Sequence, residues 1–73
     1  MLVLLVEDDP LIASAIVAGL NVQGLTTEHA ASAAAAEALL RAAIFDVLVL
    51  DVGLPDEDGL SLLQRLRRQG LTT

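Results

Sequence analysis

Carboxylates that follow apolar runs are the residues of this sequence best suited to chemistry. Glu7 and Asp8 come directly after the apolar run Leu2–Val6. Asp51 comes directly after a second run, Val47–Leu50. Three carboxylates brought together repel one another, which a bound cation relieves. Oxygen donors without His or Cys select Mg²⁺, Mn²⁺ or Ca²⁺ over zinc. A carboxylate beside such a metal can also act as a nucleophile and form an aspartyl-phosphate.

Length and composition limit what kind of molecule can carry these acids. The chain has 73 residues, 55% of them hydrophobic, and a formal net charge of −6. A chain this short buries only ~60% of its unfolded surface, so it is one small domain or part of one. The apolar content excludes disorder, and the acidic balance argues against non-specific nucleic-acid binding. The absence of Cys excludes a disulfide framework. No apolar run approaches the ~20 residues of a membrane span, so we expect a cytoplasmic protein with no membrane partner.

The first half of the chain predicts two strands around a helix. The continuous apolar run Leu2–Val6 is typical of a strand buried on both faces of a parallel sheet. Asp9 is a good N-cap residue and Pro10 suits the first helical position, so a helix should run from there to Gly24. The half-polar segment Leu25–Ala30 predicts a strand near a sheet edge.

The second half repeats the alternation of helix and strand. Ser32 can cap a second helix, and Val47–Leu50 predicts a second fully apolar strand. After a loop with several acids, Asp58 or Gly59 begins a third helix that Gly70 ends. Strands and helices that alternate in this way predict a parallel α/β sheet. Ligands of such sheets bind at the carboxyl ends of the strands, where Glu7, Asp8 and Asp51 would meet.

Helical periodicity predicts which face of each helix is buried. The inward stripe of the first helix should comprise Ile12, Ala15, Ile16, Gly19 and Leu20. That of the second should comprise Ala31, Ala35, Ala38, Leu39 and Ala42. In the third helix Leu62, Leu63 and Leu66 should face inward, and Gln64, Arg65 and Arg68 outward. His29 is expected to be an ordinary surface residue, and Asp9 a helix cap rather than a metal ligand.

Two motifs carry a resemblance to a known family. Val-Glu-Asp-Asp-Pro after an apolar strand, followed by Asp-Val-Leu-Val-Leu-Asp-Val-Gly-Leu-Pro-Asp-Glu-Asp-Gly-Leu, resembles the receiver domain of two-component response regulators. The resemblance implies a three-layer, flavodoxin-like half-domain over residues 1–73, with the parallel sheet order 2-1-3. In this interpretation residues 1–73 are the first three βα units of a truncated receiver, and the fourth and fifth strands are missing.

The same resemblance implies a role for each acid. Asp51 would be the phosphoacceptor that takes a phosphoryl group from a sensor histidine kinase. Asp8 would bind Mg²⁺ (or Mn²⁺) directly, Glu7 often through water, and Gly53 through its backbone carbonyl. Such a domain is a signalling module and not an enzyme. The start of the sequence is also similar to regulators with a C-terminal winged-helix domain, so the parent is expected to regulate transcription and to bind DNA only through an effector domain absent here.

The chain departs from the family pattern after the third helix. A receiver continues to a Ser or Thr that contacts the phosphoryl group and to a Lys that pairs with it; this chain has no Lys. We therefore expect impaired phosphorylation and an exposed third-strand edge that associates into a homodimer or higher oligomer. An alternative from another class is a non-enzymatic module that folds only by association. A phosphatase-like enzyme is disfavoured, because its second Asp would stand where Gly53 stands.

Overall fold

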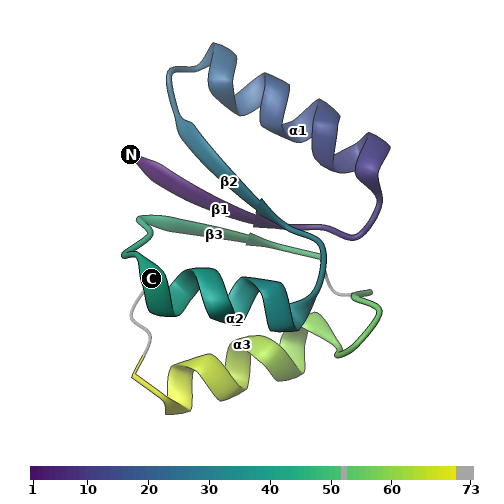
Figure 1. Ribbon diagram of the computed structural model, residues 1–73, viewed down its shortest axis with the longest axis vertical. Helices are drawn as coiled ribbons and strands as arrows, with labels where there is room; N and C mark the ends of the chain where they lie inside the picture. The colour runs from purple at the N-terminus through teal and green to yellow at the C-terminus, as the bar shows by residue number, and fades with distance from the viewer. Residues whose placement is uncertain (52, 71–73) are drawn as a thin grey trace.

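The expected alternation of strands and helices is present in the computed structural model, which describes residues 1–51 and 53–70 (Figure 1). The elements of these residues are β1 (Leu2–Val6), α1 (Pro10–Val22), β2 (Thr26–Ala30), α2 (Ala33–Ala42), β3 (Val47–Leu50) and α3 (Gly59–Arg68). The strands form one parallel sheet in the order β2-β1-β3. The predicted half-domain and its 2-1-3 order are therefore confirmed.

The predicted starts of the helices and the glycines after α1 and α3 are confirmed. The Asp9 carboxylate accepts hydrogen bonds from the amides of the first turn of α1, and the Ser32 hydroxyl accepts one from Ala35. Asp58 is the residue before α3, but its side chain makes no capping hydrogen bond. Gly24 and Gly70 have φ angles of 83° and 97°, a left-handed conformation that glycine adopts readily at a helix end.

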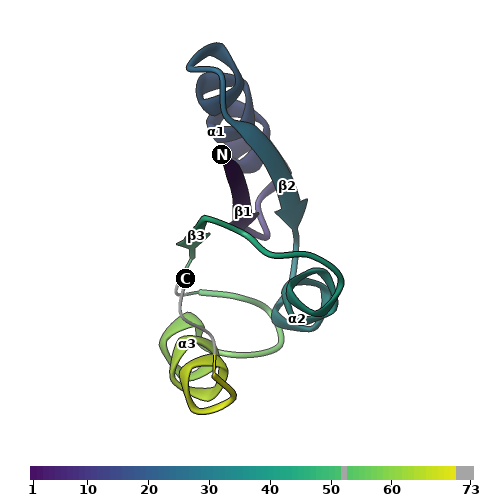
Figure 2. The ribbon, with the colours of Figure 1, turned by 90° about the vertical axis from the view of Figure 1, so that its left-hand side faces the viewer.

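The strand β1 is the centre of the molecule. It pairs with both neighbours, and four of its five residues are buried. Leu4 and Val6 belong to the main core, on the side covered by α2 and α3. Val3 and Leu5 point to the opposite face, which α1 covers. The ribbon turned by 90° shows the sheet between α1 and the pair α2 and α3, which makes three layers (Figure 2).

The predicted face of α1 is rotated in the structure. Ala13 is the buried residue of this helix, and Ile16, Val17 and Leu20 are half-buried. Ala15 and Gly19 are exposed, and Ile12 is 49% exposed. The prediction was wrong at these positions because α1 is apolar on nearly all sides, so that polar residues mark no outer face.

The predicted face of α2 is also wrong, apart from Leu39. Its buried residues are Ala33 and Ala36, while the predicted alanines are exposed: Ala31, Ala35, Ala38 and Ala42. The prediction failed because α2 consists mostly of alanines, whose pattern does not distinguish one face from another. In the structure Glu37 faces α3 and pairs with Arg65, which for that reason does not point outward as expected. The inward positions of α3 are confirmed, with Leu62 and Leu66 buried and Leu63 half-buried.

Within residues 1–51 and 53–70, no helix is long and apolar enough to cross a bilayer.

Candidate functional site

The acids meet because the strands that precede them pair in register. Val6 lies opposite Leu50 in the β1–β3 ladder. One residue further on, the Asp51 amide donates to the Val6 carbonyl at 2.9 Å. The Glu7 amide donates to the carbonyl of Ala30 on β2 at 3.0 Å. The chain leaving β1 is therefore held between the ends of both neighbouring strands. This is the carboxyl-terminal end of a parallel sheet, where ligands bind.

Glu7, Asp8 and Asp51 form the acidic cluster that the sequence predicts. One carboxylate oxygen of each residue lies within 4.8 Å of the others. Asp8 is exposed and Asp51 is half-buried, so both are open to a ligand from solvent. Three oxygen donors at this spacing suit a hard cation such as Mg²⁺. Because like charges repel at this distance, a cation would also stabilise the arrangement.

Backbone amides orient two of these carboxylates. Glu7 Oε1 accepts from the amide of Asp9 at 3.1 Å. Asp51 Oδ1 accepts from the amide of Gly53 at 3.2 Å. A carboxylate has about four lone-pair sites, so each group retains the capacity to coordinate a cation. The hydrogen bonds fix the direction of the side chains without using up their oxygens.

Gly53 lies beside the cluster, as predicted, and its carbonyl remains a predicted ligand. A Cβ atom added to it would lie 4.0 Å from Asp51 Oδ1, which is ordinary contact. The position therefore does not require glycine for space, in keeping with a role played by the backbone. Gly53 also forms an antiparallel bridge with Asp58, which closes the loop 53–58 on itself.

Two further polar residues near the cluster contact backbone groups. Asp9 uses its carboxylate to accept from the amides of Leu11 and Ile12, at 2.9 and 3.3 Å, which confirms that it caps α1. His29 is exposed, as expected, and its Nε2 lies 2.7 Å from the Glu7 carbonyl oxygen. Since a carbonyl can only accept, Nε2–H is the donor. The imidazole thus contacts the backbone of Glu7.

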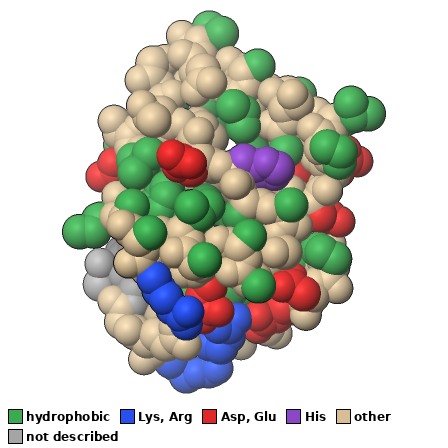
Figure 3. Space-filling model, viewed as in Figure 1, with side chains coloured by type: hydrophobic (Ala, Val, Ile, Leu, Met, Phe, Trp, Pro, Cys, Tyr) green, Lys and Arg blue, Asp and Glu red, His purple; other side chains and the backbone are tan. Residues whose placement is uncertain are grey.

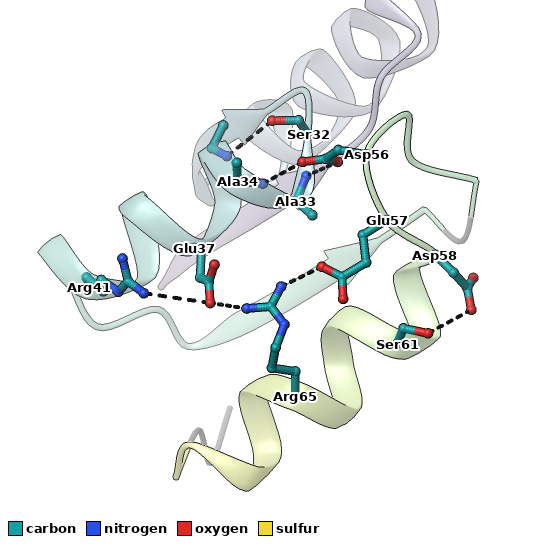
Figure 4. A network of polar contacts seen from close by, with 11 residues as sticks. Ser32, Ala33, Ala34, Glu37, Arg41, Asp56, Glu57, Asp58, Ser61 and Arg65 are labelled. Atoms are coloured by element: carbon teal, nitrogen blue, oxygen red, sulfur yellow. Dashed lines mark hydrogen bonds and ion pairs between the residues drawn. The ribbon is translucent and has the colours of Figure 1, made fainter.

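Sequence reasoning missed the contacts that hold the loop 53–58 against two helices (Figure 4). Asp56 Oδ1 accepts from the Ala33 amide at 2.9 Å, and Oδ2 accepts from the Ala34 amide at 3.0 Å. The Ala33 amide, followed by that of Ala34, lowers the pKa of the Asp56 carboxyl below its ordinary value. No local pattern predicts this contact, because Asp56 and the start of α2 are far apart in sequence.

Arg65 adds a second link between the same elements. Its guanidinium pairs with Glu57 in the loop and with Glu37 on α2, which in turn lies 3.8 Å from Arg41 (Figure 4). The hydrogen bond to Glu57 raises the pKa of the Arg65 guanidinium, and Glu37 raises it further. The spacing of Glu37 and Arg41 was a readable signal, since an i,i+4 pair of opposite charge is common on helices.

The basic residues lie away from the acidic cluster. All four arginines stand in the last turns of α2 and α3, and Figure 3 shows their side chains together at the lower end of the molecule. Among the described residues, the ion pairs engage Glu37 and Glu57 and none reaches the cluster. The negative charge of the cluster is therefore available to a cation from solution.

A three-layer fold with order 2-1-3 and acids at the ends of β1 and β3 defines a receiver-type site. The family model of the response regulator receiver domain matches residues 3–73, and the chain belongs to this family. It is 49% identical over 73 residues to the response regulator protein PmrA of Pseudomonas aeruginosa, covering 100% of this chain and 33% of that protein. It is 39% identical over 72 residues to the transcriptional regulatory protein BasR of Escherichia coli, covering 99% and 32%.

A solved structure supports the same conclusion for the fold. The receiver domain of the Francisella response regulator 1452 matches with a TM-score of 0.95 and 36% identity, over 99% of this chain and 60% of that chain. The chain thus spans about a third of the length of the two curated relatives and three-fifths of that solved domain.

Proposed function

We propose that Asp51 is the phosphoacceptor of a two-component phosphorelay and takes its phosphoryl group from a sensor histidine kinase. The observation that supports this most is the acidic cluster, which brings Asp51 within 4.8 Å of two further carboxylates at the ends of paired strands. The relatives named above are a response regulator and a transcriptional regulator. We therefore propose a cytoplasmic parent protein that regulates transcription and contacts DNA through an effector domain outside this chain.

The proposed step is a substitution at phosphorus. An Asp51 carboxylate oxygen attacks the phosphorus atom, and the bond from phosphorus to the donor nitrogen breaks with its electron pair leaving on that nitrogen. The product is an acyl phosphate on Asp51. The Gly53 amide, 3.2 Å from Asp51 Oδ1, orients the carboxylate before the reaction. Preorganisation of this kind is the main contribution that a protein makes to phosphoryl transfer.

The metal in this proposal is Mg²⁺, with Mn²⁺ as a substitute. Asp8, Asp51, the Gly53 carbonyl and Glu7, directly or through water, would hold it. The cation would neutralise negative charge on the phosphoryl oxygens and so let an anion approach a group of anions. The donor set supports this choice, since it offers only oxygen atoms.

Phosphorylation by a small acyl phosphate in the presence of Mg²⁺ tests the proposal. We expect intact-protein mass spectrometry to show the gain of one phosphoryl group in part of the sample, because phosphorylation is expected to be impaired, and Asp51→Asn should abolish this gain. Asp9→Asn is the matched control, because it removes a neighbouring carboxylate while Asn still caps a helix. A mass gain that persists in Asp51→Asn would show that the acceptor lies elsewhere.

A second candidate function is that of an association module without phosphoryl chemistry. Val47 and Val49 of β3 are each 37% exposed at the edge of the sheet, which favours contact with another chain. A sample that is folded by circular dichroism, self-associates and gains no mass would support this function over the first.

A further inference from the structure

Asp56 links the loop after β3 to the first turn of α2. This contact takes no direct part in the proposed phosphoryl transfer. Its two carboxylate oxygens accept from Ala33 and Ala34, the first two helical residues, while the Ser32 hydroxyl accepts from Ala35. Helices begin with amides that lack a helical partner, and both side chains supply partners here. Ser32 would be a sufficient cap by itself in many helices, so Asp56 is an addition from a distant loop.

The partner of Asp56 is a rigid part of the molecule. Ala33 and Ala36 in the first turn of α2 are buried in the core beside Leu4 and Val6 of β1. The amides that Asp56 binds are therefore fixed relative to the central strand. A carboxylate at a helix N-terminus is also favoured by the helix dipole. Through Asp56, the loop 53–58 is thereby held in place relative to the sheet.

The loop transmits this position to the acidic cluster. The bridge between Gly53 and Asp58 closes the loop at its base, with Asp56 between them near its tip. Leu54 is buried in the core and anchors the loop from inside. At the base, the Gly53 amide donates to Asp51 Oδ1. A continuous set of contacts thus runs from the start of α2 through Asp56 and Gly53 to the Asp51 side chain.

We propose that Asp56 is a positioning residue, which holds Gly53 against Asp51 by binding the loop to the first turn of α2. The inference rests on the proposed function for its consequence, because Gly53 and Asp51 are also the groups proposed to bind Mg²⁺. Asp56 itself does not touch the metal or the phosphoryl group. It acts by restricting the positions that the Gly53 backbone and the Asp51 carboxylate can adopt.

The test compares Asp56→Ala with Ser32→Ala in the whole chain. Both variants remove a cap from the same end of the same helix, but only Asp56→Ala releases the loop. Hydrogen exchange measured without metal should show faster exchange of the Gly53 amide in Asp56→Ala, by about three- to fivefold. In Ser32→Ala the Ala35 amide should exchange faster, with Gly53 unchanged. Equal exchange of Gly53 in both variants would overturn the proposal, whether or not the chain accepts phosphate.

A second measurement follows the consequence for the metal. Titration with Mg²⁺, followed by amide chemical shifts, should give about three- to fivefold weaker binding in Asp56→Ala and no change in Ser32→Ala. Asp56→Asn keeps one oxygen acceptor and should recover part of the loss, and it replaces the alanine variant if that variant does not fold. Faster Gly53 exchange in a chain that binds no Mg²⁺ would support the positioning role and contradict the proposed function.

Discussion

Glu7, Asp8 and Asp9 are consecutive acids, yet each has different surroundings. Asp9 caps α1, Glu7 accepts from the Asp9 amide, and Asp8 is exposed within the acidic cluster. The cluster could be predicted because strand ends of a parallel sheet meet at one edge, so acids after two apolar runs converge. Its amide contacts depend on turns after the strands and could not be predicted from residue types alone.

Asp8→Asn should weaken Mg²⁺ binding by roughly tenfold or more, because a unit charge even about 4 Å from an ion contributes about 1–4 kcal/mol between water and a protein surface, and a direct ligand lies closer. Isothermal titration calorimetry measures the change. Asp9→Asn is the control and should bind Mg²⁺ as the parent chain does. Equal losses in the two variants would indicate a general effect of negative charge and not a ligand.

The pH dependence of the Asp56 contact has a definite sign. Hydrogen bonds from the Ala33 and Ala34 amides stabilise the carboxylate, so the pKa of Asp56 in the folded chain lies below its ordinary value of about 3.9. The capping contribution is therefore complete above the unfolded pKa and is lost as the pH falls through the folded one. A carboxyl chemical-shift titration should give a midpoint below the ordinary value. A midpoint at or above it would contradict the contact.

At the level of elements, the order and the ends of the helices and strands could be predicted well, because caps, glycines and apolar runs are local signals. The faces of α1 and α2 could not. In α1 apolar residues occupy nearly every side, and in α2 similar alanines surround Glu37, whose partner Arg65 comes from α3. The orientation of such helices depends on tertiary contacts that no single segment encodes.

A pair of substitutions in α1 tests which face is buried. Ala13→Leu places extra volume in a site that is 2% exposed and should lower the free energy of unfolding by about 1–3 kcal/mol. Ala15→Leu makes the same change on an exposed position and should stay within about 0.5 kcal/mol of the parent chain. Urea unfolding followed by circular dichroism measures both. A larger loss of unfolding free energy in Ala15→Leu than in Ala13→Leu would support the face predicted from periodicity.

At the level of the whole molecule, the sheet ends at β3 among the described residues, and the α1 side of that strand is only partly covered. Val47 and Val49 are exposed there, with β1 on one side only. A strand of this kind is a template for pairing with another chain. The predicted homodimer or higher oligomer therefore stays a prediction, which the exposed valines support.

Light scattering coupled to size-exclusion chromatography tests this association over a range of concentrations. We expect the apparent mass to rise with concentration and Val49→Lys to reduce the rise, because an edge lysine opposes strand pairing. Val22→Lys, at an 81% exposed position of α1, removes the same apolar side chain away from the edge and should leave association unchanged. A monomer at all concentrations would contradict the prediction.

The central place of β1 has a consequence for synthesis of the chain. Since β1 precedes in sequence both strands that pair with it, Leu2–Val6 leaves the ribosome before β2 and β3. Pairing begins only when residue 26 and its successors follow, and β3 joins only after residue 47. Bringing β3 to β1 closes a longer stretch of chain than bringing β2 to β1, which costs only about 0.5 kcal/mol more in chain entropy. During this delay an uncharged run of Leu and Val has no strand partner. Exposed apolar runs of this kind are prone to aggregation and are bound by chaperones.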